Sequence, residues 1–270
     1  MAVTSSPTSD RSARPRLLTL RVVEYQSRLL RRFWRTSVFA YILNPIMYLG
    51  AMGFGLGGLV DKHAGTVSGV SYLVFVAPGL LAAGAMQAAA AESMWPVMYG
   101  TKWGRTYHGM VSTPIRPADV YAGVVVWTAT RAALGASVFV AVAALLGAVP
   151  SPWAVLAIPA TALCAGAFCA LLAAFSATQE SDSAFPVIMR VGILPLFLLS
   201  GTFFPVSQLP GWLRPVRFLS PLWHGVELDR GATTGSISAA SVIVHVAALA
   251  TCVIVGGLWG RRSFTRKLAS

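Results

Sequence analysis

The run YLVFVAPGLLAAGAMQAAAAE, residues 72–92, decides the fold class, because twenty uncharged residues precede its first charge at Glu92. A helix needs roughly 20 apolar residues to cross the hydrocarbon core of a bilayer. Five further segments of the chain meet this requirement. Together they predict an all-α polytopic membrane protein with six spans, over residues 38–59, 72–92, 120–149, 153–177, 185–204 and 239–259.

The composition agrees with this class. The 270 residues are 56% hydrophobic and 11% charged, whereas soluble domains carry about 25% charged residues. The net charge of +12 is gathered in clusters between the apolar runs, which is typical of membrane proteins and argues against nucleic acid as a partner. Three cysteines lie inside apolar runs and are expected to be buried rather than disulfide-bonded: Cys164, Cys169 and Cys252.

The clusters of arginine and lysine predict the orientation. They occur before the first span, in the loop after the second span and after the last span. By the positive-inside rule both termini are therefore expected in the cytoplasm. We expect a disordered tail over residues 1–15, an amphipathic interfacial helix over residues 16–36, a membrane domain over residues 37–260 and a basic tail over residues 261–270.

Several chemistries are missing from the sequence. A P-loop requires Gly-Lys-Ser/Thr, but Lys62, Lys102 and Lys267 are followed by His, Trp and Leu. The four histidines show no metal-ligand spacing, and no GxSxG motif occurs, so neither catalytic residues nor a metal site is expected. His245, inside the last span, could handle protons, but a hydrogen bond to a neighbouring helix is the favoured interpretation.

Three charged residues inside the apolar runs are functional candidates, because charges at membrane depth are costly. Arg190, near the inner end of the fifth run, can extend to the interface or pair with Glu180 or Asp182. Arg131 lies about a dozen residues into the third run, so the explanation given for Arg190 does not apply to it. We hypothesise that Arg131 pairs with Glu92 and ties the second and third spans together at a cytoplasmic gate.

The segment SGTFFPVSQLPGWLRPVRFLSPLWHG, residues 200–225, is too polar to span a membrane and too aromatic for a plain loop. Prolines at helix starts, a Ser220 N-cap and interfacial tryptophans predict an outer re-entrant helical hairpin over residues 205–231 that packs against other spans. It acts either as a structural lid or, as we favour, as an exit gate. Its candidate residues are Gly201, Pro205, Pro210, Trp212, Pro221 and Trp223.

The order of these parts resembles the membrane subunits of type-2 ABC exporters, in particular the nodulation-factor and daunorubicin-type export permeases. Three motifs carry the resemblance: YLVFVAPGLLAAGAM at 72–86, STPIRPADVYAG at 112–123 and LSGTFFPVSQLPGWLRPVRFLSPLWHGVELDRG at 199–231. The resemblance covers residues 16–270 approximately. It implies a location in the bacterial cytoplasmic (inner) membrane and a second permease subunit, identical or a sister protein. It also implies two copies of a separate ATPase subunit that bind ATP and Mg, with no cofactor in this chain.

The resemblance also implies roles for particular residues. The inner loop, residues 98–117, would hold a coupling helix seated on the ATPase, although an ordinary interfacial loop is the simpler alternative. Its candidate contacts are Trp103, Gly104, Arg105, Tyr107 and His108. The substrate path would follow the interface of the two permease subunits. Its candidate lining residues, which could equally be packing residues, are Tyr41, Asn44, Met47, Tyr48, Phe197, Phe203 and Phe204.

The expected function is therefore ATP-driven export of an amphiphile: a glycolipid, a lipid-linked saccharide or a hydrophobic drug. The alternative is a secondary transporter or channel driven by an ion gradient. That alternative would favour several intramembrane acids or inverted repeats, and the sequence shows one acid at a span edge and no clear repeat. A membrane-embedded enzyme would need a polar catalytic set at membrane depth, which the sequence lacks.

Overall fold

The computed structural model describes residues 15–32, 43–63, 65–67, 69–236 and 238–269, and in these ranges the chain is helical apart from loops and one isolated bridge between Val67 and Val70. Five helical stretches are long and apolar enough to cross a membrane: Leu43–Val60, Tyr72–Trp103, Pro117–Leu145, Pro152–Ser176 and Ala239–Ala269. The all-α polytopic class expected from the sequence is thus observed. The tail over residues 1–14 lies outside the described residues, as does Tyr41.

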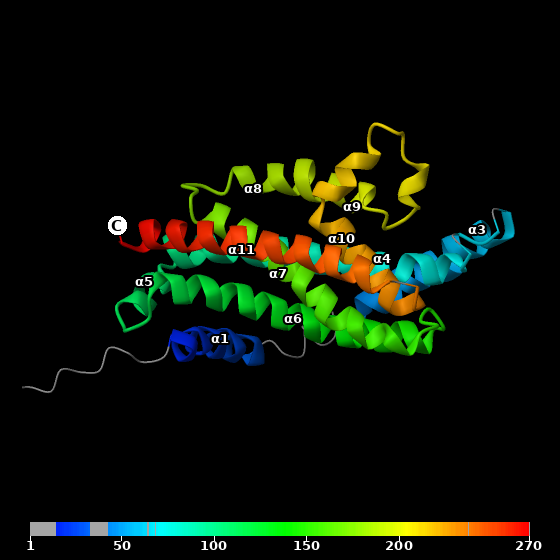
Figure 1. Ribbon diagram of the computed structural model, residues 1–270. Coiled ribbons are helices and arrows are strands. Elements are labelled where there is room, and N and C mark those ends of the chain that lie inside the picture. Colours follow the sequence, from blue (N-terminus) through cyan, green and yellow to red (C-terminus); the bar gives the residue numbers. More distant parts are fainter. Residues whose placement is uncertain (1–14, 33–42, 64, 68, 237, 270) are drawn as a thin grey trace, which may run out of the picture.

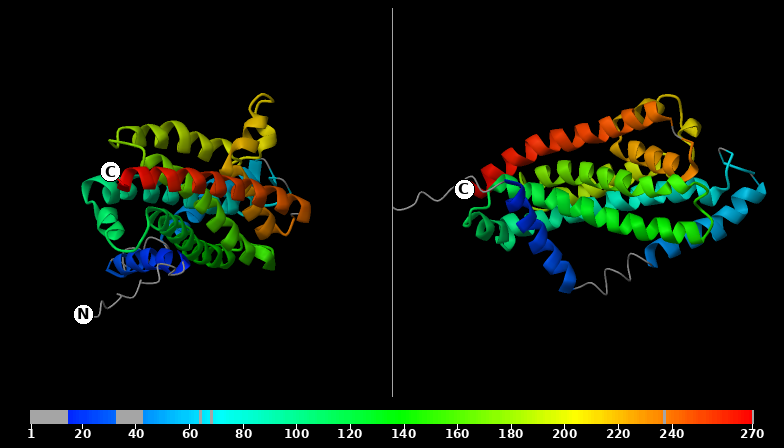
Figure 2. Two further views of the ribbon diagram at one scale, coloured as in Figure 1. Left: turned by 60° about the vertical axis from the view of Figure 1, so that its left-hand side comes forward. Right: turned by 60° about the horizontal axis from the view of Figure 1, so that its bottom comes forward.

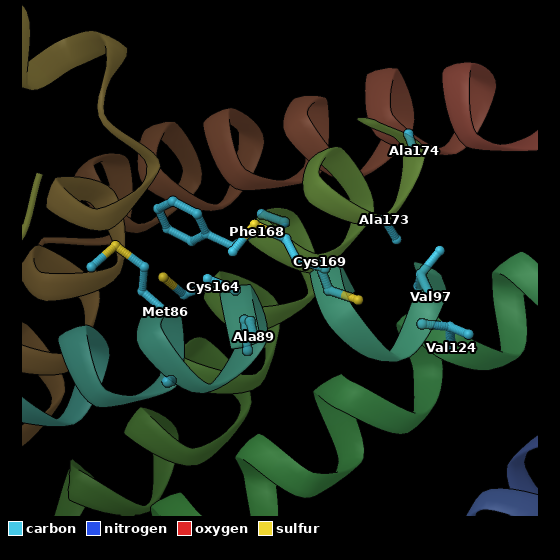
Figure 3. Packing of buried hydrophobic residues seen from close by; sticks show 14 of the residues in the cluster. Met86, Ala89, Val97, Val124, Cys164, Phe168, Cys169, Ala173 and Ala174 are labelled. Atoms are coloured by element: carbon cyan, nitrogen blue, oxygen red, sulfur yellow. The ribbon is translucent and has the colours of Figure 1, made fainter. Parts of the chain in front are cut away.

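The helix α7 (Ala157–Ser176) lies at the centre of the bundle, packed against α4 (Tyr72–Met98), α6 (Pro117–Leu145) and α11 (Ala239–Ala269) (Figure 1). The core consists largely of small side chains. Figure 3 shows Met86 and Ala89 of α4 facing Cys164, Phe168 and Cys169 of α7. Small residues let helix backbones approach closely where the hydrophobic effect between helices is weak. Cys164 and Cys169 are buried and free, as expected.

The helices α11 and α7 approach closely at Gly256. A Cβ atom added there would lie 2.7 Å from the backbone carbon of Ala170, which real side chains do not tolerate. The same requirement holds between α10 (Pro221–Thr234) and α7, where a Cβ on Gly225 would lie 2.6 Å from the Cys164 sulfur. Glycine is therefore needed at both crossings for these helices to touch.

One end of the bundle, named the inner end because the charge pattern predicts that it faces the cytoplasm, carries α5 (Thr106–Val111) and the last turns of α11 (Figure 1). The chain reaches α5 from α4 through η2 (Tyr99–Trp103). The helix α1 (Pro15–Arg32) packs obliquely on α6 (Figure 2), with Val22 fully buried against Gly123. Residues 261–269, expected to be a tail, continue α11.

The opposite end is called the outer end. It contains α3 (Gly58–His63), which follows η1 (Gly50–Gly57), and the segment between α9 and α11 (Figure 1). Here η5 (Val206–Gln208) and η6 (Arg214–Leu219) are 3₁₀ turns, and α10 follows them. Ser220 accepts a hydrogen bond from the Trp223 backbone N–H at 3.3 Å, with Pro221 in the first helical position. The predicted start of this helix is thus confirmed.

The fifth apolar run forms a shorter helix than expected. It comprises α8 (Ala184–Val187), η4 (Ile188–Ile193) and α9 (Leu194–Leu199), followed by Gly201 at φ +78°. Only Ala184–Leu199 is helical, not the predicted 185–204. At 1.5 Å per residue its length is about 24 Å, less than the ~30 Å hydrocarbon core. A further 3₁₀ turn, η3 (Pro152–Leu156), precedes α7.

Candidate functional site

A cavity of about 370 Å³ opens between the first span, α4, α6, α7 and α9. Its walls are mostly apolar and small, with Gly84 and Ala88 on α4 and Gly135 on α6. Polar and aromatic side chains interrupt these walls at a few points: Asn44, Tyr48, Gln87, Thr128, Thr161, Phe139 and Phe197. Such a mixture suits a molecule with an apolar body and a polar group.

Two opposite charges lie in the wall of this cavity. Arg131 Nη1 of α6 is 2.7 Å from Glu92 Oε1 of α4, and both side chains are only partly exposed. An isolated charge at this depth would be costly, so each residue provides the compensation that the other needs. The structure therefore brings together the two residues that we expected to pair, and the pair joins α4 to α6.

The expected path residues divide into two groups. Asn44 and Tyr48 of the first span and Phe197 of α9 line the cavity. Met47 is exposed on another face of its helix, and Phe203 packs its ring on Phe197 with 4.9 Å between centroids. Phe204 instead packs against the cluster of Val206, Leu209 and Trp223 in the outer segment.

Several residues at this site are not among the candidates predicted from the sequence. Gln87 is the one polar residue in the Ala-rich part of α4, and this isolated position is a sequence feature that could have identified it as a candidate. Phe139 carried none, because it reaches the cavity only through the packing of α6. Asp229 of α10 was also missed. It is fully buried and accepts a hydrogen bond of 2.8 Å from Thr161, whose side chain lines the cavity.

The candidate coupling residues at the inner end point in different directions. Trp103 is 52% exposed and Tyr107 is 3% exposed. The Tyr107 ring packs on Phe264 of α11, at 6.1 Å between centroids, in the space left by Gly100. Burial raises the pKa of Tyr107. Tyr107 therefore anchors α5 to the bundle, whereas Trp103 is available for contact.

The remaining coupling candidates shape the loop. Arg105 adopts a left-handed conformation at φ 48° before α5 begins. The Tyr99 ring lies over Gly104, where an added Cβ would be 2.4 Å from it, so a larger residue at this turn would displace the exposed Tyr99 side chain. Burial, followed by repulsion from Arg105 and Lys267, lowers the pKa of His108. The uncharged form of His108 is thereby favoured.

Glu180, in the loop between α7 and α8, links three parts of the inner end. Its carboxylate accepts hydrogen bonds from Lys267 Nζ of α11 at 2.6 Å and from Lys102 Nζ of η2 at 3.0 Å. These two lysines, Lys267 first, lower the pKa of Glu180 to about 2. Glu180 was one of the partners considered for Arg190, and the structure pairs it with the two lysines instead.

At the outer end, Arg230 of α10 fastens the segment after α9 to α4. Its guanidinium donates to the Gly201 carbonyl at 2.7 Å, pairs with Glu227 at 3.1 Å and lies 4.2 Å from the centre of the Phe75 ring. The backbone of Thr202 approaches α4 at Gly79, where an added Cβ would lie 2.7 Å from the Thr202 carbonyl oxygen. The outer segment therefore lies directly on α4.

The outer segment is also bonded to the last span. The Nδ1 atoms of His224 and His245 share a hydrogen bond of 2.8 Å between α10 and α11. This confirms the expectation that His245 bonds to a neighbouring helix. Trp223 stacks edge-on with His245 at 5.0 Å, whereas Trp212 is exposed at the tip. Pro205 directly precedes η5, and Pro210 lies exposed in the turn before η6.

In the described ranges, no three His, Cys, Asp or Glu side chains form a group that could hold a metal ion. Three polar contacts join separate elements: Glu92 with Arg131, His224 with His245, and Glu180 with Lys102 and Lys267. The structure thus has a cavity that can hold a ligand, an exposed inner loop, and an outer segment that is bonded to α4 and α11.

Comparison with known proteins adds a family. Residues 22–233 match the family model described as ABC-2 type transporter. Nodulation protein J of Rhizobium leguminosarum bv. viciae is 33% identical over 241 residues, covering 87% of this chain and 90% of that protein. Nodulation protein J of R. leguminosarum bv. trifolii is 34% identical over 219 residues, and that of Rhizobium meliloti (strain 1021) is 32% identical over 219 residues, each covering 81% of this chain and 82% of the relative.

Proposed function

Since the chain belongs to the ABC-2 type transporter family, we propose that it forms the membrane path of an ATP-driven exporter for an amphiphilic substrate. It is a multi-pass permease, and its family implies an ABC ATPase as partner. The observation that carries the proposal about the substrate is the cavity of about 370 Å³. Its volume falls in the range of small-molecule sites.

The cargo class follows from the walls of the cavity. Apolar side chains accommodate a hydrocarbon or ring system, while Gln87, Thr128 and the Glu92–Arg131 pair offer hydrogen bonds to a polar group. A glycolipid, a lipid-linked saccharide and a hydrophobic drug each combine an apolar part with a polar group. We propose that the cavity is one half of the path and that a second permease subunit, identical or related, supplies the other half.

Coupling is assigned to the inner loop. Two ATPase subunits, which bind ATP and Mg, would contact Trp103 on the exposed side of the loop, while Tyr107 transmits the movement to α11 through Phe264. Closure of the ATPases can shift the permease only if nucleotide binds the two arrangements with different affinity. The Glu92–Arg131 pair, between α4 and α6, would then be the inner gate, and the outer segment the exit gate. In this proposal the permease lies in the bacterial inner membrane with both termini in the cytoplasm.

The proposal is tested by co-purification with the ATPase, followed by an ATPase assay in nanodiscs with candidate amphiphiles. We expect substrate-stimulated hydrolysis by the complex. Trp103→Ala should weaken ATPase binding by roughly 2 kcal/mol, about thirtyfold, because tryptophan is enriched among the few interface residues that carry most of the binding energy. Trp153→Ala is the matched control, since Trp153 is also exposed but lies before α7 at the outer end.

Two results would contradict this function. One is a permease that transports an amphiphile in vesicles without ATPase subunits, driven by an ion gradient. The other is equal ATPase binding by the Trp103→Ala and Trp153→Ala variants, which would remove the inner loop from the interface.

A further inference from the structure

A second cavity, of about 800 Å³, lies at the inner end between η2, α5, the loop after α7 and the last turns of α11. Most of the charged side chains in its lining are positive. Five cationic side chains and one carboxylate line it: Lys102, Arg105, Arg262, Arg266, Lys267 and Glu180. We call it the basic cleft.

The cations of the basic cleft fall into two groups. Lys102 and Lys267 are held by Glu180. Across the part of the chain that the structure describes, Arg105, Arg262 and Arg266 are exposed and form no salt bridge. His108 Nδ1, which is buried in the same lining, has no hydrogen-bond partner there. The three arginines thus present several donors to an anion.

The exposed face of α11 indicates what kind of anion fits. Val255, Leu258 and Trp259 are exposed on successive turns, with Leu258 at 59%, and Trp259 also lines the cleft. Arg262 and Arg266 continue the same face at helical spacing. The helix has 31 residues, about 46 Å, so its last turns extend beyond a hydrocarbon core of ~30 Å. The face therefore changes from apolar to cationic at Trp259, an interfacial residue type.

From this arrangement we propose that the basic cleft binds the phosphate headgroup of an anionic phospholipid from the inner leaflet. The guanidinium groups of Arg262 and Arg266 contact the phosphate, for which arginine offers paired donors. The acyl chains lie along Val255 and Leu258. The site is distinct from the cavity proposed for the substrate and does not depend on what the permease exports.

The apolar face distinguishes a lipid from other anionic occupants. A free phosphate would use the arginines but not Leu258 or Val255. An acidic surface of a soluble partner would meet Arg105 at the exposed loop, but it would not extend along α11 into the hydrocarbon region. A bound lipid would also contact both the inner loop and α11, so it would fix the position of α5 against the bundle.

The experiment compares three variants of the full-length permease, Arg262→Gln, Arg266→Gln and Arg261→Gln, each of which loses one positive charge from α11. Arg266 lines the cleft, whereas Arg261, also exposed on α11, does not. Native mass spectrometry in detergent measures retention of phosphatidylglycerol, with phosphatidylcholine and inorganic phosphate as comparison ligands. We expect Arg266→Gln and Arg262→Gln each to weaken phosphatidylglycerol binding roughly fivefold, and Arg261→Gln to leave it unchanged.

A second measurement tests whether the acyl chains lie next to Trp259. Phosphatidylglycerol brominated on its chains should quench the fluorescence of the wild-type protein more than that of Trp259→Phe, and brominated phosphatidylcholine should quench both by less. The proposal is overturned if Arg261→Gln weakens binding as much as Arg266→Gln, if inorganic phosphate competes as well as the lipid, or if the difference in quenching between the wild type and Trp259→Phe is absent. Displacement of the lipid by the ATPase subunit would likewise overturn it, since the cleft would then be a protein interface.

Discussion

The pair of Glu92 and Arg131 puts two charges in the wall of an apolar cavity, at 2.7 Å from each other. Removing one partner leaves the other charge unpaired at membrane depth, which costs more than removing both. We therefore expect Glu92→Ala and Arg131→Ala each to lower stability and transport. The double variant should lose less than the sum, with a coupling energy of roughly 0.5–3 kcal/mol.

The measurement is a double-mutant cycle on thermal unfolding in detergent and on transport in vesicles. Glu24 and Arg28 of α1 are the control pair, because they also lie 2.7 Å apart but are much more exposed. Their coupling should be no more than that of an ordinary surface pair, at most about 1 kcal/mol. Additive losses for Glu92 and Arg131 would rule out a functional link between them.

At the residue scale, pairing was easier to predict from sequence than orientation. The Glu92–Arg131 contact was predictable because an unpaired charge in lipid is costly, so each of the two residues needs a partner of opposite charge. The direction of Tyr107 was not predictable, since it depends on Phe264, far away in the sequence, and on the space left by Gly100. Gln87 and Phe139 became part of a site only once α4 and α6 had packed.

At the scale of elements, the contact between α4 and the outer segment depends on Gly79. A Cβ there would lie 2.7 Å from the Thr202 carbonyl oxygen and 2.8 Å from the Thr202 Cα. Backbone atoms cannot move aside as a side chain can. We expect Gly79→Ala to lower the free energy of unfolding by roughly 1–3 kcal/mol, as overpacked cores do, and to loosen the outer segment.

Gly84→Ala is the control for stability, because it lies on the same helix with no atom within 4 Å of the added Cβ. It should leave the unfolding temperature unchanged or raise it, since alanine favours helix more than glycine does. Unfolding in detergent and proteolysis at the exposed residues near Trp212 measure the two effects. A Gly79→Ala protein as stable and as protease-resistant as the wild type would refute the close contact.

The element boundaries show why apolar runs give only part of the fold. The second run was predicted to end at its first charge, Glu92, but α4 continues to Met98, because a paired glutamate need not end a helix. The fifth run was predicted to reach Phe204, but the helix ends at Leu199 ahead of Gly201 in the left-handed region. Phe203 and Phe204 are apolar because they pack against neighbours, not because they lie in a helix.

At the scale of the whole molecule, the two ends of the bundle differ in how they are held. The outer end is fastened by the Arg230 contacts and by the His224–His245 hydrogen bond. The inner end is joined by Glu180 across η2 and α11, and these bonds are exposed to solvent. A transporter must open its ends at different stages, and different bonds at each end let them respond separately to nucleotide and substrate.

The topology depends on whether the helix Ala184–Leu199 crosses the bilayer, since this helix is about 24 Å long against a core of ~30 Å. Ser181 precedes it and Ser236 follows α10, and both are exposed. If α8–α9 crosses and the outer segment returns to the same face, the two serines lie on opposite sides. In sealed right-side-out vesicles, we expect a membrane-impermeant maleimide to label Ser236→Cys at once and Ser181→Cys only after permeabilisation.

The unmodified protein serves as the background for this labelling. Cys164 and Cys169 are buried and Cys252 is partly buried within α11, so little reaction is expected from the native cysteines. If both variants react in sealed vesicles, or neither does before permeabilisation, the helix Ala184–Leu199 does not cross. The chain would then have five crossings and its termini would face opposite sides. Opposite labelling requires a sixth crossing, and the outer segment, held on α4 by Arg230, would then cover the gap left above a helix too short to span alone.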